Sequence, residues 1–228
     1  MKVYKLPEKI SCLIFDMDLT LYSNPEYGKI QIDNLVAIAG QKRGWSDKEA
    51  QLKIEAERKS WAASHNGKKP SLSNIFLSWG FTMEENVRWR EIAYEPEKFL
   101  KKDPHLRKAL LALSAHSRGG YSLGIVTNNP VSIANRTLIS LGVEDCFSAL
   151  VGLDTCMTAK PHTLPFQKII EIFNEVNENI PGHTPITPET CVSIGDRYDI
   201  DLEIPLEMGM GAILVDGVED VYTLPELI

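Results

Sequence analysis

The chain has 228 residues, of which 43% are apolar and 24% are charged, and its 31 acidic and 24 basic side chains give a formal net charge of −7. These ordinary globular proportions exclude a disordered or collagen-like chain, and the acidic balance argues against a protein that coats nucleic acid or anionic membranes. One domain takes roughly 100–200 residues, so we expect one large domain or one domain with an addition.

Targeting patterns are weak throughout the sequence. The first seven residues contain neither a long apolar run nor a small-residue cleavage site, and no stretch approaches the ~20 apolar residues of a membrane helix. The four cysteines form no C-x-x-C pair, which favours reduced thiols over a disulfide or zinc framework. We therefore expect a cytoplasmic protein.

The first expected strand, Cys12–Phe15, runs directly into Asp16-Met-Asp18-Leu-Thr20. Side chains two apart on an extended segment point the same way, so Asp16 and Asp18 can converge on one site. Two close carboxylates repel each other unless a cation or a shared proton relieves them, and Mg²⁺ suits oxygen ligands. An Asp can also act as a nucleophile. The plainer alternative is a turn cap at a strand end.

Residues 23–100 have a different residue pattern, in which no run of apolar residues predicts a strand. Apolar residues fall at helical spacing over 29–43 and 47–63, and further helix is expected over 71–94. An insertion directly after the first strand should stand over the carboxyl end of that strand, which is where α/β sheets bind ligands.

From residue 101 onward, short apolar runs alternate with amphipathic stretches. The expected strands are Tyr121–Val126, Phe147–Val151, Thr190–Ile194 and Gly211–Val215, and the expected helices are 104–118, 130–141, 162–178 and 199–208. Such alternation predicts a parallel sheet covered by helices on both faces. The tail from Asp216 is expected to be a loop and a short closing segment.

Two weaker motifs follow expected strands or loops. The Thr127 hydroxyl, with Asn128 and the backbone N–H groups at the next helix start, suits a phosphate oxygen, although a plain helix N-cap is an alternative. Lys160, before Pro161, offers a compact positive charge for carboxylate and phosphate groups. A solvated surface lysine is its alternative.

The last motif, Gly195-Asp196-Arg-Tyr-Asp199-Ile-Asp201, follows another apolar run. Three acids within six residues at a strand end indicate a metal site, and Gly195 is expected to permit a tight turn. The alternative is a set of acids favoured by the dipole at a helix N-terminus.

Taken in order, these four motifs resemble those of the haloacid dehalogenase-like hydrolase superfamily over nearly the whole chain. The resemblance implies a Rossmann-like parallel sheet of strand order 5-4-1-2-3 with helices on both faces. It also implies an α/β core domain formed by residues 1–22 and 101–228. Residues 23–100 would be an inserted all-helical cap.

The resemblance also implies the catalytic roles. Asp16 would attack phosphorus and become an aspartyl-phosphate, and Asp18 would act as general acid and then general base. Thr127 and Asn128 would bind the phosphate group, and Lys160 would hold both Asp16 and the phosphate. Leu19 departs from the family pattern, which has Gly in many relatives.

Magnesium is the cofactor that the resemblance implies. The metal residues are Asp16, Asp18 through its backbone carbonyl, and Asp196, with Asp201 or Asp199 as the further acid nearby. Arg197 stands where many relatives have Ser or Thr, which leaves the reaction class unchanged.

The function expected is Mg²⁺-dependent hydrolysis of a small soluble phosphorylated metabolite by a monomer or homodimer. Alternatives are a phosphonate hydrolase with a Schiff-base lysine (Lys53, Lys68 or Lys69), a sugar-phosphate mutase, or a non-catalytic protein that binds a phosphorylated ligand. No nucleic-acid or membrane partner is expected.

Substrate choice is expected in the cap. A group of polar and aromatic residues near one helix end and loop is a candidate for contact with the leaving group: Arg58, Trp61, His65, Asn66 and Lys68. The alternative, which we favour for most of them, is that the tryptophans (Trp45, Trp61, Trp79 and Trp89) form the core of the cap and the lysines a solvated loop.

Overall fold

The computed structural model describes residues 1–115, 120–178 and 184–228 and contains one six-stranded sheet. Its strands are β1 (Lys2–Lys5), β2 (Cys12–Phe15), β3 (Ser122–Val126), β4 (Ala149–Val151), β5 (Cys191–Gly195) and β6 (Gly211–Leu214). Their spatial order is β1-β6-β5-β2-β3-β4, in which β2 to β6 are parallel and β1 pairs antiparallel with β6. The predicted order 5-4-1-2-3 is confirmed for β2 to β6, and β1 is an additional edge strand.

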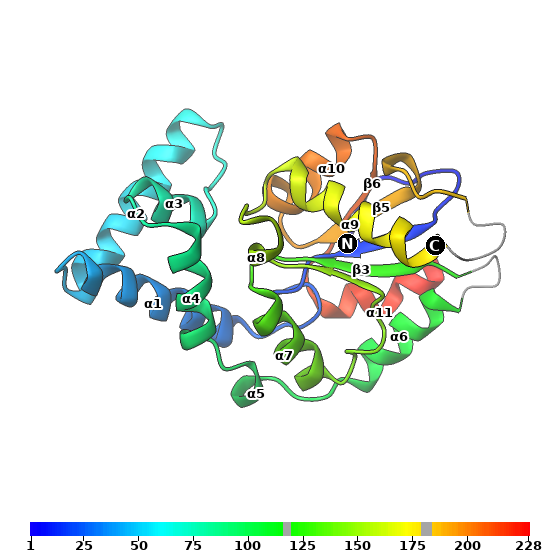
Figure 1. Cartoon of the computed structure of the whole chain (residues 1–228), viewed down its shortest axis with the longest axis horizontal. Coiled ribbons are helices and arrows are strands. Elements are labelled where there is room, and N and C mark those ends of the chain that lie inside the picture. Colours follow the sequence, from blue (N-terminus) through cyan, green and yellow to red (C-terminus); the bar gives the residue numbers. More distant parts are fainter. Residues whose placement is uncertain (116–119, 179–183) are drawn as a thin grey trace.

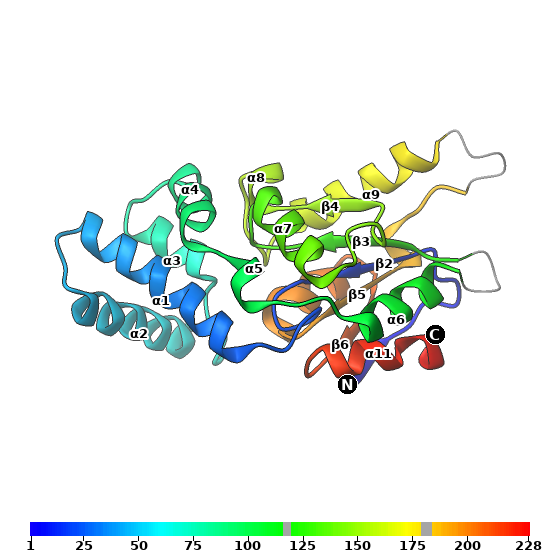
Figure 2. The same ribbon diagram turned by 90° about the horizontal axis from the view of Figure 1, so that it is seen from below.

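Helices cover both faces of the sheet, as predicted (Figure 2). An apolar core lies on each face of the sheet. The side chains of β2 point alternately into the two cores, since successive residues of a strand face opposite sides. Leu13 and Phe15 join the core beneath α6 (Pro104–Ser114), α7 (Val131–Leu141) and α11 (Val218–Leu227). Cys12 and Ile14 join the core beneath α9 (Thr163–Asn177).

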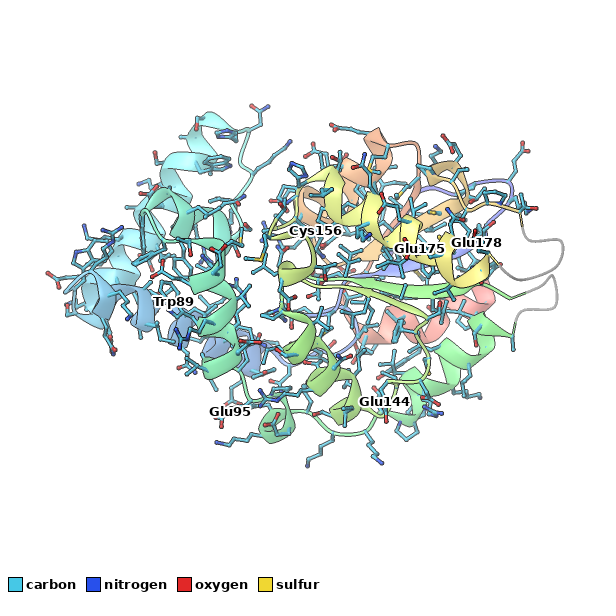
Figure 3. All side chains as sticks on the ribbon, viewed as in Figure 1. Trp89, Glu95, Glu144, Cys156, Glu175 and Glu178 are labelled. Carbon is cyan, nitrogen blue, oxygen red and sulfur yellow. The ribbon has the colours of Figure 1, made fainter. Side chains whose placement is uncertain are left out.

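A helical segment is inserted between β2 and β3. Its helices before α6 are α1 (Pro25–Lys42), α2 (Asp47–Ser64), α3 (Leu72–Ser78), α4 (Met83–Ala93) and α5 (Pro96–Phe99). Helices α1 to α4, which we call the cap, form a lobe beside the sheet (Figure 1). The lobe has its own apolar core, and Trp89 of α4 lies among its helices (Figure 3). The inserted helical cap is thereby confirmed, while its division from the core at residues 22/23 and 100/101 stays a prediction.

Local sequence explains where the cap helices begin. Ser46 and Glu49 form a capping box at the start of α2, and Thr82 and Glu85 form another at the start of α4. The helix expected over 71–94 is divided into α3 and α4, because Gly80 adopts a φ of +81° between them.

Three further elements differ from the sequence expectation. The helix expected over 104–118 ends at Ser114, and residues 116–118 lie outside the described part of the chain. The stretch expected as helix over 199–208 is one π-helical turn, Tyr198–Leu202, followed by α10 (Glu203–Glu207). The expected closing segment is the helix α11, whose buried residues Val218, Val221 and Leu224 are spaced for one helical face.

The remaining short elements are α8 (Leu153–Cys156) and a 3₁₀ turn at Pro188–Thr190. Within the described residues, no helix combines the length and the apolar character that crossing a bilayer requires.

Candidate active site

The motif residues gather at the carboxyl ends of three neighbouring parallel strands. Asp16 directly follows β2, Thr127 follows β3 and Asp196 follows β5. Because these ends lie at one edge of the sheet, side chains far apart in sequence meet there. Lys160 reaches the same place from the loop before α9.

Lys160 is the charged centre of the site and is 2% exposed. Its Nζ donates to Asp16 Oδ1 at 2.6 Å, to Asp201 Oδ1 at 2.7 Å and to the Val126 carbonyl oxygen at 2.7 Å. Burial works against the ammonium charge, but Asp16 and Asp201 outweigh it and raise the pKa of Lys160. The lysine therefore stays positively charged, and the surface-lysine alternative is wrong.

Three carboxylates face one another beside this ammonium. Asp16, Asp196 and Asp201 each place an oxygen within 4.8 Å of the others. Burial, followed by the charges of Asp16 and Asp201, raises the pKa of Asp196 to about 8. Burial also raises the pKa of Asp201, to about 6, against the opposing effect of Lys160. These three buried carboxylates repel one another when all of them are ionised. A hard divalent cation prefers oxygen ligands and would offset the repulsion.

Of the two acids left open by the sequence, Asp201 is the one in this cluster. Asp199 instead accepts hydrogen bonds from Arg197 Nη2, at 2.8 Å, and from the Lys69 backbone N–H, at 3.3 Å. The Asp18 carboxylate does not belong to the three-acid group either, so only its backbone carbonyl remains a candidate metal ligand.

Asp201 is fixed by the π-helical turn that carries it. The Ser193 hydroxyl donates to the Asp201 carbonyl oxygen at 2.8 Å, and the Arg197 backbone N–H donates to Asp201 Oδ2 at 3.1 Å. A Cβ on Gly195 would lie 2.5 Å from Asp201 Cβ. Gly195 is therefore needed for this close approach, and the tight turn expected from sequence is not its main role.

Asp18 is held by two neutral donors. The Tyr22 hydroxyl donates to Asp18 Oδ1, and Asn129 Nδ2 donates to Asp18 Oδ2 at 2.7 Å. Burial raises the pKa of Asp18, although these two hydrogen bonds and the charges of Lys160 and Arg90 oppose the rise. The next residue, Leu19, adopts a φ of +60°, a conformation that costs a non-glycine residue about 1–2 kcal/mol.

Sequence reasoning missed both donors to Asp18. Asn129 directly follows the predicted Thr-Asn motif, and its position near the end of the strand could have indicated that it belongs to the site. Tyr22 lies four residues after Asp18, and no simple spacing rule marks it.

Thr127 and Asn128 are engaged within the protein. Thr127 Oγ1 accepts a hydrogen bond from the Asn129 backbone N–H at 3.1 Å. The Asn128 amide donates to the Lys160 carbonyl oxygen at 3.2 Å and accepts from the Lys160 backbone N–H at 2.7 Å. Asn128 thus positions the backbone of Lys160, and phosphate binding by Thr127 and Asn128 stays a prediction.

Two adjoining cavities share five lining residues: Asp18, Leu19, Asn128, Arg197 and Ile200. A cavity of about 180 Å³ is lined by the acid cluster and Lys160. A cavity of about 540 Å³ extends from Asp18 to the cap, where Arg58 and Arg90 line it. Asp18 therefore lines both the cavity of the acid cluster and the cavity that reaches the cap.

The candidate cap residues are divided between different places. Arg58 lines the large cavity, whereas Trp61, His65 and Lys68 line a separate cavity of about 180 Å³. Lys68 forms an ion pair with Glu203 of the core at 2.7 Å. Asn66, with a φ of +52°, lies in the turn after α2.

The tryptophan interpretation is wrong for one of its four members. Trp45, Trp79 and Trp89 pack in the apolar core of the cap. Trp61 is 42% exposed and stacks on His65 with ring centroids 3.9 Å apart.

Comparison with known proteins identifies the family. The fold and the acid–lysine cluster are those of an α/β enzyme with a Rossmann-like core. A family described as haloacid dehalogenase-like hydrolase matches residues 10–209, and this chain therefore belongs to it.

Three curated relatives are phosphatases. Phosphoglycolate phosphatase of Colwellia psychrerythraea is 32% identical over 91 residues, covering 40% of this chain and 34% of that protein. Phosphoglycolate phosphatase of Pasteurella multocida is 22% identical over 181 residues, covering 73% and 74%. Glyceraldehyde 3-phosphate phosphatase of Pyrococcus abyssi is 30% identical over 134 residues, covering 56% and 50%. The chain thus spans about a third of the Colwellia protein.

Two solved structures share the fold. A haloacid dehalogenase-family phosphatase from Thermococcus onnurineus is 22% identical with a TM-score of 0.57, covering 90% of this chain and 86% of that one. A magnesium-bound hydrolase of the family from Bacillus subtilis is 17% identical with a TM-score of 0.52, covering 96% and 100%.

Proposed function

We propose that this protein is a Mg²⁺-dependent phosphomonoesterase that acts on a small soluble phosphorylated metabolite through an aspartyl-phosphate. The observation that carries the proposal is the cluster of Asp16, Asp196 and Asp201 with the buried Lys160 ammonium. It supplies a nucleophile, oxygen ligands and a fixed positive charge in one cavity. Relatives named for phosphoglycolate and glyceraldehyde 3-phosphate favour a small substrate.

The first step forms a bond from an Asp16 carboxylate oxygen to phosphorus and breaks the bond to the leaving alcohol. Lys160, 2.6 Å from Asp16, offsets the repulsion between the carboxylate and the phosphate dianion. Asp18 gives its proton to the leaving oxygen. Its raised pKa suits this role, because a buried carboxyl holds a proton nearer to neutral pH.

The second step reverses the task of Asp18. As a carboxylate it accepts a proton from a water molecule that attacks phosphorus, and the bond between phosphorus and Asp16 breaks. Tyr22 and Asn129 hold both oxygens of Asp18 throughout, which orients the group for both transfers.

The carboxylate cluster fits Mg²⁺. Asp16, Asp196 and the Asp18 backbone carbonyl would hold the ion, with Asp201 joined to Lys160 beside them. Bound Mg²⁺ would supply charge stabilisation for the phosphoryl oxygens. Magnesium in the Bacillus subtilis relative supports this choice of ion.

The phosphonate-hydrolase alternative has less support. Lys53 lies over the Trp45 ring, with Nζ 4.6 Å from the centroid, and Lys68 is paired with Glu203. None of the three candidate lysines, Lys53, Lys68 and Lys69, lines the two cavities that contain Asp18. Borohydride reduction in the presence of a phosphonate aldehyde should consequently leave the protein unmodified.

Two further alternatives are separated by their products. A mutase would return the phosphoryl group to a sugar phosphate, whereas we expect inorganic phosphate as the product. A non-catalytic binding protein would need no acid in the position of Asp18, held by two donors.

The test is phosphate release from p-nitrophenyl phosphate with Mg²⁺. We expect release by the wild type, a loss of at least about 1,000-fold in Asp16→Asn, and wild-type activity in Asp47→Asn, which changes an exposed acid of the cap. A folded wild type that binds phosphate analogues but releases no phosphate from any small monoester would overturn the proposal.

A further inference from the structure

The large cavity between cap and core carries an excess of positive charge. Four cationic side chains and two carboxylates line it: Lys29, Arg58, Arg90, Arg197, Asp18 and Asp33. Lys29 is paired with Asp33, and Arg197 is paired with Asp199. Among the described residues, no carboxylate lies within ion-pair distance of Arg58 or Arg90.

Arg90 is a buried cation, and the hydrogen-bond partners that the described residues supply to it are neutral. Its side chain is 4% exposed, and Nη1 donates to the Asn86 carbonyl oxygen at 3.2 Å and to Asn86 Oδ1 at 3.3 Å. Nη2 donates to Ser73 Oγ at 3.1 Å. These contacts fix the guanidinium without neutralising it. The charge of Asp18 acts on Arg90 only from beyond ion-pair distance. A buried cation without a directly paired anion is costly, so this site is suited to an anion that arrives with the ligand.

Two more donors line the same cavity. Burial, and then the positive charge of Arg197, lowers the pKa of Arg58, and the smaller opposing effect of Glu55 does not compensate for them. Gln31 Nε2 is buried without a hydrogen bond of good geometry, although the side chain lies close enough to the Tyr22 and Tyr27 hydroxyls to oppose the rise in their pKa values. A ligand anion would relieve the repulsion between Arg58 and Arg197 and would give Gln31 Nε2 a better aligned acceptor.

We propose that Arg90, with Arg58 and Gln31, binds a second anionic group on the leaving alcohol, so that the substrates are phosphomonoesters of alcohols bearing a carboxylate or a further phosphate. The inference rests on the proposed function, because it assumes that the phosphoryl group occupies the smaller cavity beside Lys160. Both cavities meet at Asp18, which would face the ester oxygen between the two anions.

The experiment measures binding without turnover, by calorimetry on the whole protein with Mg²⁺. Three phosphonates, each with three carbon atoms, are compared: propylphosphonate, 3-phosphonopropionate and propane-1,3-bisphosphonate. We expect the wild type to bind one or both of the doubly anionic ligands about 10- to 100-fold more tightly than propylphosphonate, since hydrogen bonds to charged groups contribute on that order. The tighter of the two identifies carboxylate or phosphate as the preferred anion.

Arg90→Gln should reduce this preference to about threefold or less, while propylphosphonate still binds. Arg88→Gln is the matched control, because Arg88 is an exposed residue of the same helix and lines neither cavity. It should keep the wild-type preference. If Arg90→Gln does not fold, Arg58→Gln should reduce the preference by a smaller factor.

Equal binding of all three ligands by the wild type, or a preference that survives in Arg90→Gln, would overturn the inference. These outcomes are separate from failure of the proposed function. That failure would appear as absent phosphate release from monoesters, whatever the ligand preference.

Discussion

Lys160 compensates two carboxylates that the fold buries at the end of the sheet. Asp16 and Asp201 both contact its Nζ, and the lysine and Asp201 are almost inaccessible to solvent. A buried ion pair adds little net stability when it is intact, but removing one partner leaves an uncompensated charge. The site therefore depends on this side chain for stability as well as for chemistry.

In Lys160→Met, we expect the free energy of unfolding to fall by about 3–5 kcal/mol without metal, because Asp16 and Asp201 lose their counter-ion. Urea denaturation measures this change. Lys168→Met is the control, since Lys168 pairs with Glu171 in solvent and should cost less than about 1 kcal/mol. An equal decrease in the free energy of unfolding in the two variants would contradict the role of Lys160 as the counter-ion of Asp16 and Asp201.

Gly195→Ala should displace Asp201, because the new Cβ would lie 2.5 Å from Asp201 Cβ. We expect a loss of about 1–3 kcal/mol in stability and a large loss of phosphatase activity. Gly28→Ala is the comparison for stability. Its Cβ would meet nothing within 4 Å in helix α1, and it should stabilise the protein by about 0.5–1 kcal/mol. In thermal unfolding, the melting temperature should fall in Gly195→Ala and rise in Gly28→Ala. A raised melting temperature in Gly195→Ala would contradict the predicted clash with Asp201.

Individual residues differ in how well the sequence reveals them. Asp16, Asp18 and Asp196 are recognisable because each lies within three residues of the end of an apolar strand, in an ordered set of motifs. Arg90 gives no such indication. It resembles Arg88 in sequence, and only the packing of α4 buries one and exposes the other. The partners of Asp18 are equally hidden, because Asn129 reaches it from another strand end.

The elements of the sheet were predictable where they are buried on both faces. Strand β1 was missed because its four residues are exposed and lack a run of apolar side chains. The stretch that forms helix α11 was expected to be a loop and a short closing segment, since Gly and Pro, here Gly217 and Pro225, are common in turns. Three apolar residues at helical spacing, Val218, Val221 and Leu224, nevertheless bury one face on the sheet.

The end of helix α2 should report on ligand binding. Trp61 lines a cavity shared with Pro161 and Glu203 of the core, whereas Trp45 packs edge-on against Trp79 inside the cap. If the cap closes on a bound ligand, as we expect, Mg²⁺ with vanadate should change the tryptophan fluorescence. Trp61→Phe should remove most of the change and Trp45→Phe should preserve it. An unchanged spectrum in the wild type at saturating vanadate would count against cap closure.

The molecule as a whole collects negative charge at one edge of its sheet, and this makes its stability depend on metal and pH. Burial and then Asp16 and Asp201 raise the pKa of Asp196 to about 8 in the folded protein. A group with a raised folded-state pKa favours folding most below its unfolded pKa. That contribution declines as the pH rises through the folded pKa.

Without metal, the contribution of Asp196 to stability should therefore fall from about pH 4 to about pH 8. Mg²⁺ should raise the melting temperature more at about pH 8.5 than at about pH 5.5, because it offsets carboxylates that are then ionised. Asp196→Asn should flatten the metal-free pH dependence and reduce the magnesium shift. A magnesium shift that is equal in wild type and variant would exclude Asp196 as a ligand.

The proposed roles of the core and the cap follow from the position of the insertion, directly after strand β2. Under the proposed function, the core would present Asp16 and Lys160 to the phosphoryl group, and Arg58 and Arg90 in the cap wall of the large cavity would face the leaving group. The additional length of the chain, beyond an ordinary α/β domain, would then select the substrate, as we propose.

The most direct test is to locate the phosphoryl group during turnover. The wild type is mixed with Mg²⁺ and a small phosphomonoester, quenched rapidly in acid, digested and examined by mass spectrometry. We predict phosphate on the peptide that contains Asp16, at Asp16 itself, and none on that peptide in Asp16→Asn. Turnover with phosphate found on another residue, or with no phosphorylated residue under conditions that preserve acyl-phosphates, would contradict the proposed mechanism.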